Sequence, residues 1–211
     1  MTPCFPFLRD RAKLGFTLVE LLVVLVIIAL LAGISIPAFL KMNQSSVLST
    51  ASDLLLDQLN FARQSALTLN RGVEVRFYRL PTPNNGATSC YRALQSFALQ
   101  DGATQALSRP IFFPAQVQMA SAADFSTLLD PARTDVQTGT GAAAQVQLPQ
   151  VGLNYTYCAF RFRTDGSTTL ASPATITLHL VSNPPVGSTL PSNWFTLQID
   201  PLTGRMQTFR P

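Results

Sequence analysis

The apolar stretch from Phe16 to Ile36 constrains this chain more than any other feature of the sequence. Its length matches the roughly 20 apolar residues that a helix needs to cross the hydrocarbon core of a bilayer. The apolar part of a cleaved signal peptide is shorter, roughly 7–15 residues, and no Ala-x-Ala-like cleavage site follows the stretch. The sequence therefore predicts a membrane-spanning helix at 16–36.

Glu20 is the one charged residue within this apolar stretch. An acidic side chain in the lipid core costs about 2.5–3.5 kcal/mol even on insertion scales, so charges inside membranes usually have a partner. The stretch contains no basic residue. A new α-amino group, created if the chain were cut just before Phe16, would supply a cation for Glu20 of the same or a neighbouring subunit.

The segment GFTLVE at 15–20 resembles the cleavage and methylation site of type IV pilins and pseudopilins. The resemblance implies that a prepilin peptidase cuts after Gly15 and methylates the amine of Phe16. It also implies an assembly role for Glu20, and Pro37 stands where such proteins carry a helix-kinking proline. A plain signal anchor with an incidental glutamate is the alternative.

The resemblance further implies an α+β, pilin-like fold, in which a long N-terminal helix packs on a C-terminal antiparallel sheet. We expect a leader peptide at 1–15, a transmembrane and assembly helix at 16–36, an amphipathic continuation of the helix at 37–71 and a β-rich globular domain at 72–211.

The amphipathic part of the helix is indicated by apolar residues that recur every three or four positions, which places them on one stripe. They are Val47, Ala51, Leu55, Leu59, Ala62, Ala66 and Leu69. We expect this stripe to pack on the sheet, with a coiled-coil dimer seam as the alternative. Gly72 is the expected C-cap glycine.

Alternating apolar residues and turn signals predict strands along the rest of the chain. The expected strands lie at 72–80, 90–100, 110–119, 155–163, 175–181, 194–200 and 205–209. One helical turn is expected at 124–129. The Thr-, Gly- and Ala-rich segment 134–147 has little to pack and is expected to be a mobile loop.

The net charge of the chain is +4, and about half of this excess belongs to the leader. Positive residues beside a membrane span stay in the cytoplasm. We therefore expect a single-pass inner-membrane protein whose C-terminal domain is periplasmic or extracellular, and which is fibre-associated after assembly.

Two cysteines, Cys90 and Cys158, remain after removal of the leader. An oxidising compartment permits a disulfide between them. Two separate buried thiols are the alternative, because the sequence gives no distance between them.

No catalytic, metal or cofactor site is predicted. His179 is the one histidine, no Gly-x-Ser-x-Gly elbow surrounds a serine, and no cluster of metal-ligating residues stands out. A hydrolase would need Cys90, Cys158 or a serine beside His179. His179 falls on the outward side of its expected strand, where a solvated residue is the simpler interpretation.

Further segments refine the resemblance. Residues 59–66, 73–77, 162–167 and 203–205 resemble, in this order, the minor pseudopilin H and FimT family, and the ending 193–211 is similar to the D protein of the Verru_Chthon pilin-like cassettes. The implied function is that of a minor pilin or pseudopilin in a type II secretion pseudopilus or a type IV pilus-like fibre. The implied partners are other pilins, prepilin peptidase and an inner-membrane assembly platform.

Binding of nucleic acid is the alternative function. Some FimT-like minor pilins bind DNA through a C-terminal Gly-Arg-x-Arg motif, and here Gln207 replaces its second arginine. Arg205 and Arg210 are the candidate DNA contacts. Two arginines neutralise about two phosphates, which predicts weak and salt-sensitive binding.

Overall fold

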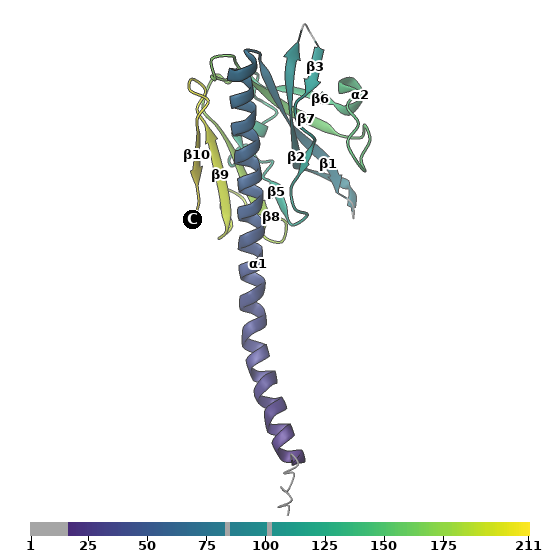
Figure 1. Cartoon of the computed structure of the whole chain (residues 1–211), viewed down its shortest axis with the longest axis vertical. Coiled ribbons are helices and arrows are strands. Elements are labelled where there is room, and N and C mark those ends of the chain that lie inside the picture. The colour runs from purple at the N-terminus through teal and green to yellow at the C-terminus, as the bar shows by residue number, and fades with distance from the viewer. Residues whose placement is uncertain (1–16, 83–84, 101–102) are drawn as a thin grey trace, which may run out of the picture. The chain divides into compact units, whose positions relative to one another are not determined.

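The computed structural model describes residues 17–82, 85–100 and 103–211, and for 32–43 and 82–88 it describes no side chains. The chain divides into an N-terminal unit that ends at Met42 and a second unit, Asn43–Pro211. Figure 1 shows the ribbon of the chain, coloured from the N-terminus to the C-terminus. The two units are described separately below.

The helix α1 comprises Leu18–Leu69, which confirms the predicted long helix over the described residues. It begins after Thr17, whose Oγ1 accepts a hydrogen bond of 3.2 Å from the N–H of Glu20, as an N-cap threonine does. It ends at Asn70, which has a φ of 50°. Asparagine tolerates this left-handed conformation, so Asn70 ends the helix and the expected role of Gly72 as the C-cap is wrong.

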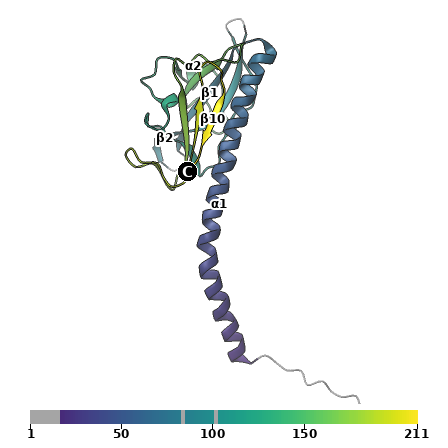
Figure 2. The ribbon, with the colours of Figure 1, turned by 90° about the vertical axis from the view of Figure 1, so that its left-hand side faces the viewer.

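Most of the predicted apolar stripe on α1 is buried against the sheet. Ala51, Leu55, Leu59, Ala62 and Ala66 are fully buried. At the two ends the stripe differs from the prediction: Leu48 is buried where Val47 is half-buried, and Leu69 is 46% exposed. Figure 2 shows the C-terminal part of α1 lying along the sheet. The expected packing on the sheet is therefore confirmed.

In the described part of the chain, ten strands form one sheet in the order β10-β9-β8-β5-β2-β1-β7-β6, with β3 and β4 also paired to β2. All of the strand pairs are antiparallel. The strands are β1 Val73–Thr82, β2 Asn85–Gln100, β3 Ala103–Ala106, β4 Ile111–Phe112, β5 Val117–Met119, β6 Gln137–Thr140, β7 Thr156–Phe162, β8 Ala174–Leu180, β9 Trp194–Ile199 and β10 Met206–Phe209. The short helices are η1 Thr127–Leu129 and α2 Gly141–Ala144.

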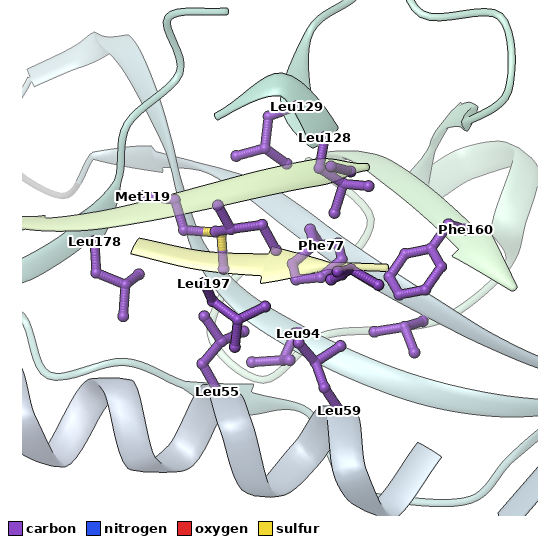
Figure 3. Close-up of a cluster of buried hydrophobic side chains, with 14 of the residues drawn as sticks. Leu55, Leu59, Phe77, Leu94, Met119, Leu128, Leu129, Phe160, Leu178 and Leu197 are labelled. Carbon is purple, nitrogen blue, oxygen red and sulfur yellow. The ribbon is translucent and has the colours of Figure 1, made fainter. Parts of the chain in front are cut away.

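The main core lies between α1 and the sheet. Alternate residues of β1, β7, β8 and β9 lie in this core, as the sequence predicted for Cys158, Phe160 and Phe162 on β7. Figure 3 shows Leu55 and Leu59 of α1 rising toward the side chains of the sheet. Each fully buried leucine or phenylalanine contributes about 1.5–3 kcal/mol relative to an exposed one. The predicted α+β fold, a helix packed on an antiparallel sheet, is confirmed.

Three predictions for residues 110–147 need correction. The expected strand at 110–119 is two short strands, β4 and β5. The helical turn expected at 124–129 is the 3-10 helix η1, which follows Ser126.

The expected mobile loop at 134–147 is wrong, because β6 pairs with β7 and α2 follows it directly. A side chain added at Gly139 would meet the Tyr157 hydroxyl at 2.5 Å. The small residues of this segment therefore allow a close approach of β6 to the neighbouring tyrosine.

The opposite face of the sheet is also covered. A second cluster of buried residues includes Tyr78, Leu80 and Ala93 from β1 and β2, together with Leu148 and Tyr155 from the segment after α2. This segment therefore closes one end of the outer face.

Candidate assembly site

Glu20 lies in the first turn of α1. Negative charge at a helix N-terminus is favoured, because the unpaired N–H groups and the helix dipole present positive charge there. Phe16 and Gly15, the residues expected to flank the processed bond, lie outside the described residues. The structure therefore places Glu20 at the start of the helix, and a pairing of its carboxylate with the amine of Phe16 stays a prediction.

The side chains on both sides of Glu20 are apolar and exposed in this single chain. The large apolar residues from Leu18 to Leu30 are between 44% and 80% exposed, and no other charged residue lies in this segment. Exposed apolar surface of this extent marks a contact with other proteins or with lipid. This surface has the chemistry that an assembly helix needs.

The expected span at 16–36 lies partly outside the described residues, since Phe16 and the side chains from 32 onward are not described. No helix in the described part of the chain is both long enough and apolar enough to cross a membrane. The backbone of α1 is helical through Pro37, and the kink expected at this proline stays a prediction.

Three of the segments that suggested a family converge on Arg63 of α1. The Nε of Arg63 donates hydrogen bonds to the carbonyl oxygens of Gly166, at 3.3 Å, and Thr203, at 3.2 Å. Gly204 has a φ of 61°, and a Cβ there would lie 2.1 Å from the Gly166 oxygen. Arg63 therefore links the helix to two turns of the sheet.

Both cysteines are free, which agrees with the alternative of two separate thiols, although Cys158 is buried and Cys90 only half-buried. Cys90 is opposite Leu80 on one side of β1, and Cys158 is opposite Phe77 on the other side. Two strands that flank a third lie about 10 Å apart, whereas the Cα atoms of a disulfide lie within about 7 Å. The register of the sheet therefore keeps the two thiols apart.

Burial also makes the Cys158 thiol unreactive. Its Sγ donates to the carbonyl oxygen of Leu128 at 3.3 Å. Burial raises the pKa of the Cys158 thiol to about 12, while Arg133 acts in the opposite direction. Because the thiolate is the nucleophile, this residue is an inert part of the core.

His179 is 2% exposed, so the expectation of a solvated histidine is wrong. Its Nδ1 lies 2.9 Å from the Leu180 carbonyl oxygen, which can only accept, so Nδ1 carries the proton. Its Nε2 lies 3.5 Å from the side-chain nitrogen of Gln118. Burial lowers the pKa of His179, so the ring is neutral at pH 7.

The outward face of β8 is covered by residues 125–127, which the sequence did not place there. The Oγ1 of Thr177 donates to the Phe125 carbonyl oxygen at 2.6 Å, and the Thr177 N–H donates to the Oγ of Ser126 at 3.0 Å.

Within the described residues, no group of three or more His, Cys, Asp or Glu side chains could hold a metal ion. His179 and Cys90 are separated by β5, about two strand spacings or 10 Å.

The two candidate DNA contacts have different surroundings. Arg210 is held on the molecule: its guanidinium donates to the Oγ of Ser52 at 3.1 Å and lies 5.2 Å from the ring centre of Phe195. The Nη2 of Arg210 also lies 3.9 Å from the Oδ1 of Asp53, and both side chains are exposed. Arg205 is exposed. Arg210 is therefore engaged with residues of the same chain, and a role of either arginine in DNA binding stays a prediction.

Sequence reasoning missed a buried ionic cluster on the outer face of the sheet. Glu74 accepts from the Nε of Arg76 at 2.6 Å and from the Nε of Arg161 at 2.9 Å. Arg76 also lies between the rings of Phe97 and Tyr157, 4.2 and 4.9 Å from their centres. The alternation of Glu74 and Arg76 on β1 was visible, but nothing in the sequence showed that this face would be covered.

Comparison with known proteins identifies the N-terminal motif. The family model of the prokaryotic N-terminal methylation motif matches residues 10–36. This match contains Gly15, Phe16 and Glu20, so it confirms the predicted resemblance at the residues that carry it. No curated protein matches the chain.

Two solved structures are similar to this one. The type IV minor pilin FimU of Pseudomonas aeruginosa has 15% identity and a TM-score of 0.41, and the match covers 78% of this chain and 97% of that one. The minor pseudopilin EpsH from the type 2 secretion system of Vibrio cholerae has 10% identity and a TM-score of 0.43, with the same coverage.

A methylation motif at the start of a long helix, followed by packing of that helix on an antiparallel sheet, defines a type IV pilin-like protein. The narrower resemblances, to the minor pseudopilin H and FimT family and to the D protein of the Verru_Chthon cassettes, stay predictions.

Proposed function

We propose that this chain is a minor pilin or pseudopilin, a non-enzymatic structural subunit of a type II secretion pseudopilus or a type IV pilus-like fibre. The observation that carries the proposal is the methylation motif at 10–36 on a helix whose exposed, apolar surface contains one carboxylate, Glu20. In this proposal, prepilin peptidase cuts after Gly15 and methylates the amine of Phe16. The subunit then awaits assembly in the inner membrane, with its sheet domain outside the cytoplasm.

The physical basis of assembly is that Glu20 gains a partner, while its apolar neighbours exchange lipid for equally apolar helices. The apolar side chains from Leu18 to Leu30 leave lipid for contact with the helices of other subunits. The carboxylate of Glu20 meets the Phe16 amine of a neighbouring subunit and no longer lies unpaired in lipid, where it costs about 2.5–3.5 kcal/mol. Other pilins and the inner-membrane assembly platform are the partners in this step.

The proposal is tested by replacing Glu20 with alanine in the natural host. We expect Glu20→Ala to enter the membrane normally and to be incorporated into the fibre at least tenfold less, as measured by immunoblots of sheared fibres and membranes. Asp57→Ala is the matched control, because Asp57 is an exposed carboxylate on the same helix. Normal incorporation of Glu20→Ala would show that the carboxylate has no assembly role.

A further inference from the structure

A groove on the outer face of the sheet has the properties of a binding site. A cavity of about 680 Å³ lies between β2, the segment 109–115 around β4 and the segment 146–150 that follows α2. A second cavity of about 400 Å³ shares Arg92, Phe112, Pro149 and Gln150 with the first and continues past Leu80. We call the two together the β2–β4 groove. Each volume lies within the range of about 300–1,000 Å³ that is usual for binding pockets.

The charges that line the β2–β4 groove all have one sign. Arg92 lines both cavities and Arg109 lines the larger one, whereas neither cavity is lined by Asp or Glu. The groove is therefore complementary to a negatively charged group. A guanidinium group can bind a carboxylate through two parallel N–H donors. Among the side chains of a partner protein, those of Asp and Glu therefore fit this groove best.

Arg92 has an unused donor at this place. Its Nε is buried and has no hydrogen-bond partner among the described residues. A buried donor without a partner costs about 1–3 kcal/mol. The Nη1 of Arg76 is also buried without a partner, but the Arg76 guanidinium is compensated by Glu74 and by two aromatic rings. Arg92 has no such compensation among the described residues, and a ligand carboxylate would supply it.

The rest of the lining contains both apolar and polar side chains, among them Phe112, Gln147 and Gln150. Phe112 is 38% exposed and lines both cavities, so it offers an aromatic face to a ligand. The segment 146–150 follows Gln145, which has a φ of 55°, and ends at Gln150, which has a φ of 65°, so a non-glycine residue with a left-handed backbone stands at each end. Such conformations cost free energy and tend to persist at binding sites. Proline at 149 further restricts this wall.

We propose that the β2–β4 groove binds an extended peptide segment of a partner protein that carries an Asp or Glu next to an aromatic residue. The carboxylate accepts from the guanidinium of Arg92 and compensates its charge, with Arg109 as the second cation. The aromatic side chain packs on Phe112. An extended peptide is favoured over a compact small molecule, because the two adjacent cavities together reach from Gln95 on β2 to Leu80 on β1. The proposal does not depend on assembly of the chain into a fibre.

The test uses the full chain in non-ionic detergent and two fluorescein-labelled peptides with blocked ends, Gly-Phe-Asp-Phe-Gly and Gly-Phe-Asn-Phe-Gly. Fluorescence anisotropy gives their dissociation constants. We expect the Asp peptide to bind at least tenfold more tightly than the Asn peptide. We expect Arg92→Gln to lose at least tenfold in affinity for the Asp peptide, and Phe112→Ala to lose at least threefold.

Arg205→Gln is the matched control, because it removes the same charge from an exposed position that lines neither cavity. It should bind the Asp peptide as the parent chain does, and far-UV circular dichroism should show that each variant is folded. Equal binding of the Asp and Asn peptides would overturn the proposal, as would unchanged binding by folded Arg92→Gln. Full displacement of the peptide by equimolar 3-phenylpropionate would assign the groove to a small organic acid and would also overturn it.

Discussion

Arg63 shows how a single residue can join segments that are far apart in the sequence. It lies on the side of α1 that the stripe pattern left undefined, and its guanidinium reaches the carbonyl oxygens of Gly166 and Thr203. The sequence contained both turns and the arginine, and their resemblance to one family was visible. Their meeting point was not, because no local pattern encodes which helix side chain satisfies which turn carbonyl.

The two cysteines should differ in reactivity. In the folded chain, iodoacetamide should modify Cys90, which is half-buried. It should leave Cys158 unmodified because burial raises the pKa of that thiol to about 12 and keeps it protonated. In guanidinium chloride both should react, as peptide mass spectrometry can show. Resistance of both thiols until a reductant is added would indicate a disulfide and would contradict the free thiols of the structure.

Asp135 predicts one part of the acid sensitivity of the domain. The carboxylate accepts from the Nε of Arg133 and from the Ala171 N–H, both at 2.7 Å. The hydrogen bond from Arg133 is the main cause that lowers the pKa of Asp135 from 3.8 to about 2, against the opposing effect of burial. A carboxyl group with a lowered folded-state pKa stabilises the fold above its unfolded pKa and loses this contribution as the pH falls.

The stabilisation by Asp135 should therefore be complete above about pH 4 and disappear between pH 4 and 2. Because solvent reaches the pair, its screening reduces the contribution to about 1 kcal/mol. Urea unfolding followed by Trp194 fluorescence should show Asp135→Asn less stable than the parent chain by this amount at pH 6 and equally stable near pH 2. A constant difference over this pH range would contradict the assignment.

At the scale of elements, period and alternation predicted what packs against α1. The helix, β7, β8 and β9 follow from apolar residues at helical or strand spacing, since one buried face leaves a regular pattern. The cover of the outer face left no such pattern. The burial of His179, the pairing of β6 and the β2–β4 groove depend on loops that fold back over the sheet, and polar or small residues in loops carry little local signal.

The helix stripe can be tested with two leucines that the sequence treated alike. Leu59 is fully buried against the sheet, whereas Leu69 is 46% exposed at the end of the helix. We expect Leu59→Ala to destabilise the sheet domain by about 3 kcal/mol, because it removes buried apolar surface and leaves a cavity. Leu69→Ala should cost less than about 0.5 kcal/mol. Urea unfolding of both variants measures the difference, and equal costs would contradict the observed packing.

At the scale of the whole molecule, the chain combines two units with different surfaces. The sheet unit buries its apolar residues in its own core. The N-terminal unit exposes apolar side chains over its described length, with a single carboxylate among them. Such a surface is suited to contact with lipid or with other helices, and it lies within the methylation motif at 10–36. The assembly proposed here depends on the conversion of one peptide bond into a cationic partner for Glu20.

The most direct measurement is the mass of the mature N-terminal peptide of the chain purified from its natural host. Our account predicts that the peptide begins at Phe16 and carries one methyl group on its α-amine. In a host without prepilin peptidase, the same peptide should instead remain joined to the leader through Gly15. A mature chain that still begins at Met1, or at any residue other than Phe16, would contradict the account.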